Sequence, residues 1–228
     1  MLLPGTRLPD ADTDWILRPD IMQRLDLRAV FGNANPVEME LGAGDGSFLA
    51  QRAAAHPGRN FLGVERLLGR LRKLDRKARR AGLQNVRCLR LEAAYALEWM
   101  MPPGGLDVLH VYFPDPWPKR RHWKRRLVNR SFALLAAAAL GPGGQVYLRT
   151  DHAGYFEAIL EAFAGLPEFG PTTVPPDLEV LETDFEREFR ARGIPTHHAA
   201  FERMPGHGDA VGRKAGVPRI SAQDEEGE

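Results

Sequence analysis

Short apolar runs alternate with longer amphipathic stretches along most of the chain. The apolar runs have the length and aliphatic content of buried strands, and they fall at residues 37–41, 60–64, 86–91, 106–112 and 145–150. Each run precedes a stretch with helical periodicity. These stretches lie at residues 47–55, 67–80, 92–100 and 154–163, and one more follows the basic run and ends at residue 140. Strands that alternate with helices in this way predict a parallel sheet with helices on both faces, which is the doubly wound, Rossmann-like α/β fold.

The two ends of the chain have less regular patterns. Residues 1–14 are rich in Pro, Asp and Thr and indicate an arm, and residues 15–31 contain a predicted helix that begins near Pro19. Near the other end, Thr183 and Glu186 have the spacing of a capping box at the start of a helix, and residues 197–203 are a candidate last strand. We therefore predict three parts: an N-terminal arm and helix at 1–35, a main domain at 36–203, and a disordered tail at 204–228.

Composition narrows the class of protein. The chain has 228 residues, of which 43% are hydrophobic and 27% are charged, and this suits one domain with a substantial core. The single cysteine, Cys88, excludes a disulfide framework and a cysteine zinc cluster, and no other spacing indicates a metal site. No apolar run approaches the ~20 residues of a membrane-spanning helix, and no signal peptide is evident at the N-terminus, so we expect a cytoplasmic protein without a membrane partner.

Acidic residues stand at or just after the ends of all five predicted strands. These are Glu40, Glu65, Glu92, Asp115 and Asp151. In a doubly wound sheet the carboxyl ends of parallel strands form one edge, and ligands bind in the crevice at that edge. The pattern therefore predicts a ligand site lined by carboxylates.

A glycine-rich turn follows the first of these strands, in the sequence LGAGDGS at residues 41–47. Such a turn lets the backbone approach a ligand closely, but it departs from G-x-G-x-x-G because Ser47 stands where the third glycine would be. Glu65 lies 23 residues after Gly42, a spacing that suits an acceptor for ribose hydroxyls in a dinucleotide or an S-adenosylmethionine site. The turn and the acid thus indicate a nucleoside-type cofactor without naming it; the alternative is an ordinary turn beside solvated acids.

The segment VYFPDPWPKRRHWKRR at residues 111–126 combines one acid with a dense run of cations. Asp115 stands between Pro114 and Pro116, which end the strand and stiffen the turn. The cations that follow are Lys119, Arg120, Arg121, Lys124, Arg125 and Arg126. A fixed carboxylate beside a cationic surface indicates a polyanionic substrate, although a solvated basic helix start would show the same charge run.

The motifs ELGAGDG, GVER, YFPDPWPKRRHWKRR, RTDH and TDFE occur in this order between residues 38 and 203. In this order and context they resemble the bacterial tRNA (guanine-N7)-methyltransferases, and the block FPDPWPK with the following His and KRR carries most of the resemblance. The resemblance implies a class I methyltransferase fold with a mostly parallel, seven-stranded sheet, S-adenosylmethionine as cofactor, and tRNA as partner. The implied reaction is methylation of N7 of the guanine at position 46 in the variable loop.

The resemblance also implies roles for individual residues. The cofactor contacts would be Glu40, Gly42, Gly44, Glu65, Glu92 and Asp115, and Asp115 would also be the catalytic residue. The substrate contacts would be Lys119, Asp151, Thr183, Asp184, Phe185 and Glu186. Arg120, Arg121, Lys124, Arg125 and Arg126 should contact the phosphates of tRNA, which supply affinity rather than sequence information. Glu92 stands where Asp is usual in the family. The oligomeric state and a role for the tail stay open.

The chemistry of this reaction limits what the catalytic residue must do. Guanine N7 has an in-plane lone pair, so it attacks a sulfonium methyl without first losing a proton, and alignment of the two groups is the main requirement. We therefore expect Asp115 to position the guanine and to favour the cationic product rather than to act as a base. Asp151 or Glu186 could serve the same purpose, and Trp117 could stack on a base or pack under the loop.

Two other functions share parts of the pattern. A nicotinamide-dependent dehydrogenase would use the same sheet and ribose acid, but it should carry G-x-G-x-x-G and does not need KRRHWKRR. A non-catalytic RNA-binding module would use the basic surface, but it does not need Glu40, Glu65 and Glu92 together at strand ends. Identification of the bound cofactor by mass spectrometry separates the dehydrogenase, and methyl transfer to unmodified tRNA separates the non-catalytic module.

Overall fold

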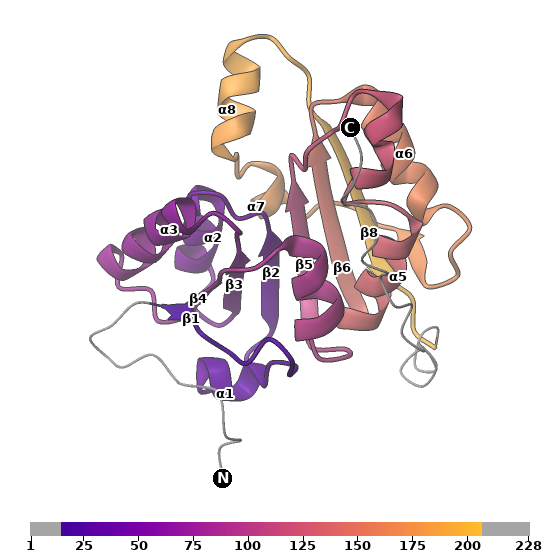
Figure 1. Ribbon diagram of the computed structural model, residues 1–228. Coiled ribbons are helices and arrows are strands. Elements are labelled where there is room, and N and C mark those ends of the chain that lie inside the picture. Colours follow the sequence, from indigo (N-terminus) through magenta and orange to yellow (C-terminus); the bar gives the residue numbers. More distant parts are fainter. Residues whose placement is uncertain (1–14, 207–228) are drawn as a thin grey trace, which may run out of the picture.

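A single twisted sheet of eight strands forms the centre of the molecule (Figure 1). The computed structural model describes residues 15–206. The strands are β1 Ile16–Leu17, β2 Val37–Leu41, β3 Asn60–Val64, β4 Val86–Leu89, β5 Leu106–Tyr112, β6 Leu140–Thr150, β7 Phe169–Pro171 and β8 His197–Arg203, in the spatial order β1-β4-β3-β2-β5-β6-β8-β7. The pairs from β1 to β6 are parallel, and β8 runs antiparallel to both β6 and β7. The predicted doubly wound, mostly parallel sheet is confirmed, with one strand more than expected.

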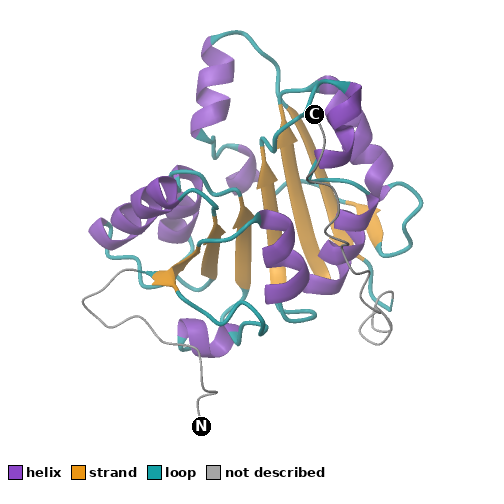
Figure 2. Cartoon of the chain, viewed as in Figure 1, coloured by secondary structure: helices purple, strands orange, loops and turns teal. Residues whose placement is uncertain are grey.

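Helices cover both faces of this sheet (Figure 2). They are α1 Leu27–Phe31, α2 Ser47–Ala55, α3 Leu68–Arg80, α4 Ala93–Tyr95 continued by the π-helical turn Ala96–Met100, the 3-10 helix η2 at Arg120–Arg125, α5 Arg130–Ala139, α6 Ala153–Phe163, α7 Pro176–Glu179 and α8 Asp184–Ala191. Phe61 of β3 packs with α2 and α3, whereas its neighbour Leu62 belongs to the core shared with α5 and α6. Alternate residues of a strand point to opposite faces, so these two cores lie on opposite sides of the sheet.

The first described segment differs from its predicted helix. Ile16 and Leu17 pair with Cys88 and Leu89 at the outer edge of β4, and only Leu27–Phe31 is helical, with Asp26 as its N-cap. Pro19 follows one residue after the short strand, and the local pattern cannot show that β4 offers an unpaired edge. Residues 1–14 and 207–228, to which we assigned the arm and most of the tail, lie outside the described residues. In the described part of the chain, no helix is both long and apolar enough to cross a bilayer.

The capping box predicted for the late helix is confirmed. The Thr183 hydroxyl accepts a hydrogen bond from the Glu186 N–H at 3.1 Å, and Glu186 Oε2 accepts one from the Thr183 N–H at 2.9 Å. These bonds fix the start of α8, which stands above the carboxyl ends of the parallel strands (Figure 1). The fold therefore brings the segment TDFE to the edge of the sheet where the strand-end acids lie.

Candidate active site

The carboxyl ends of the parallel strands open into a cavity of about 600 Å³. Its lining includes Gly42, Glu65, Glu92, Asp115, Trp117, Arg125 and Phe185. Glu40 and Asp151 are not among the residues that line the cavity. Glu40 is buried next to the lining residue Leu41, and Asp151 directly follows β6. The structure thus brings together three of the five predicted strand-end acids, the glycine turn and one residue of TDFE. The volume lies in the range of small-molecule sites.

The glycines of the turn have two different functions. Gly42, Gly44 and Gly46 have φ values of 79°, 56° and 76°, in the left-handed region that favours glycine. A Cβ at Gly42 would meet nothing within 4 Å, so its backbone is open toward the cavity. A Cβ at Gly46 would lie 2.2 Å from Cδ1 of Leu74, so this glycine allows α3 to pack against the turn. The first glycine therefore leaves open space at the cavity, and the third allows packing.

Glu65 connects two of the elements that form the cavity. Its Oε2 accepts a hydrogen bond from the Gly44 N–H at 3.2 Å, and its Oε1 accepts one from the Leu67 N–H at 2.8 Å, next to the start of α3. Each carboxylate oxygen has a second lone pair that remains available for the hydroxyls of a ribose. Glu65 consequently fixes the turn and still presents acceptors to the cavity.

Glu92 is the N-cap of α4 on the neighbouring part of the cavity wall. Its Oε2 accepts a hydrogen bond from the Tyr95 N–H at 2.9 Å, while the side chain stays exposed. The cap fixes the orientation of the carboxylate, so its other oxygen can accept a hydrogen bond from an amino group in the cavity.

Glu40 is a buried carboxyl group with an unsatisfied atom. The residue is 4% exposed, and Oε2 has no hydrogen-bond partner among the described residues. Burial raises the pKa of Glu40 to about 8; Arg149 partly opposes this shift, and the charges of Asp45 and Glu65 add to it. An unpartnered acid beside the glycine turn suits a cationic group of a ligand, which would supply the missing counter-charge.

The loop that carries Asp115 is held in a strained conformation. Phe113 and Trp117 are the non-glycine residues with positive φ in the described chain, at 52° and 43°. Such residues cost about 1–3 kcal/mol each and persist only where the surroundings fix them. Here the Phe113 N–H donates to the Arg149 carbonyl at 2.8 Å, and Arg126 Nε donates to the Pro116 carbonyl at 2.8 Å. The exposed side chain of Asp115 is therefore presented by a backbone that is anchored on both sides.

Arg126 differs from the expectation that it contacts phosphate. Its side chain is buried, with 5% of the residue exposed, and its guanidinium lies 4.7 Å from the ring centres of both Trp123 and Tyr155. The carbonyl of Pro116 requires a donor inside the fold, and Arg126 supplies it. This position therefore stabilises the loop, and its phosphate assignment is corrected.

The other cations of the basic run do reach the surface. Lys119, Arg120, Arg121, Lys124 and Arg125 are all exposed, on and beside η2. Arg125 also lies 5.0 Å above the ring of Trp117, whose edge contacts His122. Trp117 is thus packed within the loop, and because it also lines the cavity, its stacking on a base stays a prediction.

The TDFE segment divides into an inner and an outer pair. Asp184 and Phe185 are exposed, and Phe185 lines the cavity and lies 6.0 Å from the Phe113 ring. Thr183 and Glu186 are buried, and Arg149 Nη1 donates to Glu186 Oε2 at 2.6 Å. Burial alone would raise the pKa of Glu186, but hydrogen bonds from His198 and Thr183 and the charge of Arg149 lower it to about 2. In this structure Thr183 and Glu186 position α8, and their assignment as substrate contacts stays a prediction.

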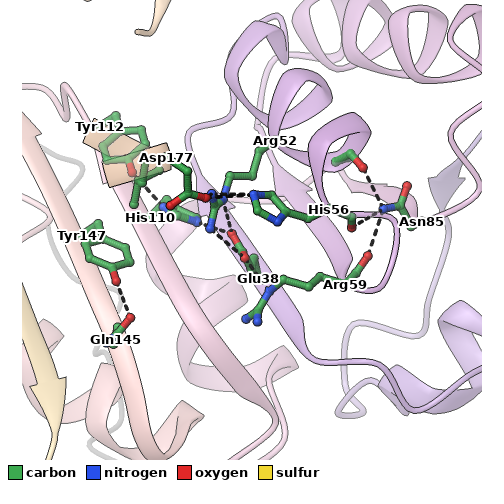
Figure 3. A network of polar contacts seen from close by, with 12 residues as sticks. Glu38, Arg52, His56, Arg59, Asn85, His110, Tyr112, Gln145, Tyr147 and Asp177 are labelled. Atoms are coloured by element: carbon green, nitrogen blue, oxygen red, sulfur yellow. Dashed lines mark hydrogen bonds and ion pairs between the residues drawn. The ribbon is translucent and has the colours of Figure 1, made fainter. Parts of the chain in front are cut away.

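A buried network of polar side chains around Glu38 was not predicted from sequence (Figure 3). Glu38 is fully buried in β2 and pairs with Arg52 at 3.0 Å and with His110 Nε2 at 2.9 Å. Burial lowers the pKa of His110, so its neutral ring donates to Glu38 through Nε2 and accepts from the Tyr112 hydroxyl at 2.8 Å. The network joins β2, β5 and α2 below the cavity. Its only signal in the sequence was the presence of charged residues inside otherwise apolar strands.

This fold and this cavity define a class of protein. The structure is similar to that of the 16S rRNA methyltransferase KamB, with a TM-score of 0.61 and 18% identity over 88% of this chain and 100% of that chain. Likeness at this level concerns the fold, which is the Rossmann-like fold of class I methyltransferases. A family model described as putative methyltransferase matches residues 34–198.

Curated relatives narrow this class to one family. The tRNA (guanine-N(7)-)-methyltransferase of Alkalilimnicola ehrlichii is 40% identical over 189 residues, which cover 81% of this chain and 78% of that protein. The protein of the same name from Geobacter metallireducens is 38% identical over 74% of this chain and 81% of its own length. The chain belongs to the tRNA (guanine-N(7)-)-methyltransferase family, and the predicted resemblance is confirmed.

Proposed function

We propose that this enzyme transfers a methyl group from S-adenosylmethionine to N7 of the guanine at position 46 in the variable loop of tRNA. One observation carries the proposal: the glycine turn, Glu65, Glu92 and the strained loop with Asp115 surround the same cavity. A nicotinamide-dependent dehydrogenase has no use for the exposed cations beside that loop. Because tRNA is the substrate, we place the activity in the cytoplasm.

The residues of the cavity fit S-adenosylmethionine. The open backbone at Gly42 leaves room for it, Glu65 offers acceptors to ribose hydroxyls, and Glu92 offers one to an adenine amino group. The unpartnered Oε2 of Glu40 suits the cationic methionine end. When bound, this cofactor supplies an electrophilic methyl on its sulfonium.

Asp115 is assigned to the guanine. An ionised carboxylate accepts hydrogen bonds from guanine N1–H and N2–H and stabilises the positive charge that develops as N7 is methylated. Phe185 and Trp117, which line the same cavity, offer ring faces for the base, since recognition of an unstacked base commonly uses aromatic stacking. Lys119, Arg120, Arg121, Lys124 and Arg125 would contact the phosphates.

The test is methyl transfer from labelled S-adenosylmethionine to unmodified tRNA, followed by mapping of the modified base. We expect N7-methylguanosine at position 46 and no transfer to the same tRNA with adenine at that position. Transfer to another guanine would contradict the assigned position, and binding of tRNA without any transfer would favour a non-catalytic RNA-binding module.

A further inference from the structure

The outward face of α3 carries a concentration of positive charge. The helix Leu68–Arg80 contains seven cationic residues and one acid. Leu71, Leu74, Asp75 and Ala78 form its buried stripe. The residues opposite that stripe are Arg72, Lys73, Arg76 and Arg80, all exposed, and we refer to these four as the α3 ridge.

Nothing in the described chain neutralises the α3 ridge. Asp75 faces inward, where it accepts from the Trp15 N–H at 2.7 Å and pairs with Arg79 at 4.0 Å, and Lys77 pairs with Asp45. Among residues 15–206, the four ridge side chains have no ion pair or hydrogen bond. Arg72, Arg76 and Arg80 follow one another at i, i+4, a spacing at which like charges destabilise a helix. A polyanion on this face would relieve that repulsion.

The α3 ridge continues from the cavity. Arg66 and Arg70, just before it in sequence, line the cavity together with Arg125 from the basic run. From Arg72 to Arg80 the ridge extends about 12 Å along the helix axis. The cavity lining thus takes cations from two different elements, the start of α3 and η2.

We propose that the α3 ridge binds phosphates of a helical arm of the tRNA while the target guanine lies in the cavity. This inference rests on the proposed function. Double-stranded RNA is recognised mainly through its backbone and shape. Phosphate oxygens accept hydrogen bonds, so side chains that only donate, such as the Arg and Lys of the α3 ridge, are suited to contact them. An anionic membrane is a poorer partner, because a membrane-surface helix needs an exposed apolar face, whereas Leu71, Leu74 and Ala78 of α3 are fully buried.

The test compares Arg76→Gln, Arg80→Gln and the double variant with Arg28→Gln. Gln has nearly the helix propensity of Arg, and Arg28 is an exposed control in α1, at the far end of the sheet from α8 (Figure 1). The plot of log affinity for tRNA against log salt concentration should lose about 0.7–0.9 of its slope per ridge residue, or about fivefold in affinity at about 0.15 M salt. The turnover number at saturating tRNA, the cofactor affinity and the melting temperature should not fall.

Three results would overturn the inference. A slope equal to that of Arg28→Gln would show that RNA does not contact the ridge. A lower turnover number with an unchanged slope would show that the ridge acts through the fold. Wild-type binding to phosphatidylserine vesicles that the double variant loses, with tRNA affinity unchanged, would assign the ridge to a membrane. If the wild type methylates no tRNA but the ridge variants still lose tRNA affinity and slope, the proposed function fails and the ridge inference stands.

Discussion

Asp115 owes its placement to the backbone around it. None of the described residues donates a hydrogen bond to its carboxylate, whereas Phe113 and Trp117 on either side have strained φ values. The Phe113 N–H and the Pro116 carbonyl anchor the backbone between them. A carboxylate held in this way retains all its acceptor positions for a ligand. Its charge is thus available where charge develops in the reaction, with little reorganisation.

Asp115→Asn tests this role directly. The substitution keeps the size of the side chain but removes the charge and places a donor amide against the guanine N–H groups. The single-turnover rate at saturating cofactor should fall by about a hundredfold or more, while tRNA affinity stays nearly constant because phosphate contacts carry most of it. In the wild type the rate should be flat between about pH 5.5 and 8.5, whereas a base that titrates in that range gives a log-linear rise that Asp115→Asn abolishes. Such a rise would assign Asp115 as a base.

Glu40 provides a second prediction at the scale of one residue. Burial raises the pKa of this carboxyl to about 8, so at pH 7 it is mostly protonated before the cofactor binds. A cationic group next to Oε2 favours the ionised form, and binding should then release close to one proton. Calorimetry of S-adenosylmethionine binding in buffers of different ionisation enthalpy measures this release. Glu40→Gln should remove it; equal release by both proteins would place the cation elsewhere.

At the scale of elements, Arg149 connects β6 with the α7–α8 segment. Its guanidinium donates to the carbonyls of Leu178 and Leu181 at 2.7 and 2.8 Å and to Glu186, and it lies 4.5 Å from the ring centre of Tyr112. On the outer side, Ser47 Oγ donates to Asp184 at 2.8 Å and so ties the glycine turn to α8. The glycine turn and the TDFE segment are thus parts of one connected structure.

Arg149→Ala should loosen α8 more than the rest of the fold. It leaves the buried carboxylate of Glu186 without its main counter-charge, a change that costs about 3–5 kcal/mol in buried pairs. Amide hydrogens of residues 184–191 should exchange faster, and the KM for tRNA should rise. Arg187→Ala, which removes an exposed ion pair on the same helix, is the matched control and should change little. Equal effects of the two substitutions would exclude a special role for Arg149.

Most helices and strands between residues 37 and 163 could be predicted from the local sequence. The spacing of apolar residues and the glycine turns that predict them extend over only a few residues. β1 and β7 could not be predicted in this way, since each depends on an edge offered by a distant strand. The same limit applies to the site. Topology predicts that strand-end acids meet at one edge, but no local signal shows that Arg126 and Glu186 turn inward or that Glu38 finds a partner in His110.

At the scale of the whole molecule, the stability of the fold depends on pH through buried carboxyl groups whose pKa values are shifted in opposite directions. Burial alone would raise the pKa of Glu38, but His110 and Arg52 outweigh it and lower the pKa to about 2, as Arg149 and His198 help to do for Glu186. These two groups stabilise the fold above their unfolded values near 4.5, and this contribution is lost as the pH falls toward 2. Glu40, with a raised pKa, destabilises the fold as the pH rises from 4.5 to about 8.

Burial lowers the pKa of His110, so below its unfolded value near 6.5 this group opposes the effect of Glu40, and the free energy of unfolding should be largest near about pH 6.5 and should decline on both sides. Denaturant titrations between about pH 3 and 8 measure it. In Glu40→Gln the decline on the alkaline side should disappear, while the loss on the acid side remains. A decline toward pH 8 that persists unchanged in Glu40→Gln would show that another group causes it.

The place of β8 in the sheet has a consequence for how the protein is made. This strand lies between β6 and β7, and Arg203 at its end donates to the Leu140 carbonyl at 2.8 Å. A nascent chain completes the five central strands and all the cavity residues before His197–Arg203 leaves the ribosome, so β6 then has an uncovered edge. Uncovered edges of unfinished sheets favour pairing with other chains. Synthesis of β8 is therefore the step that covers the edge of β6 and joins β7 to the sheet.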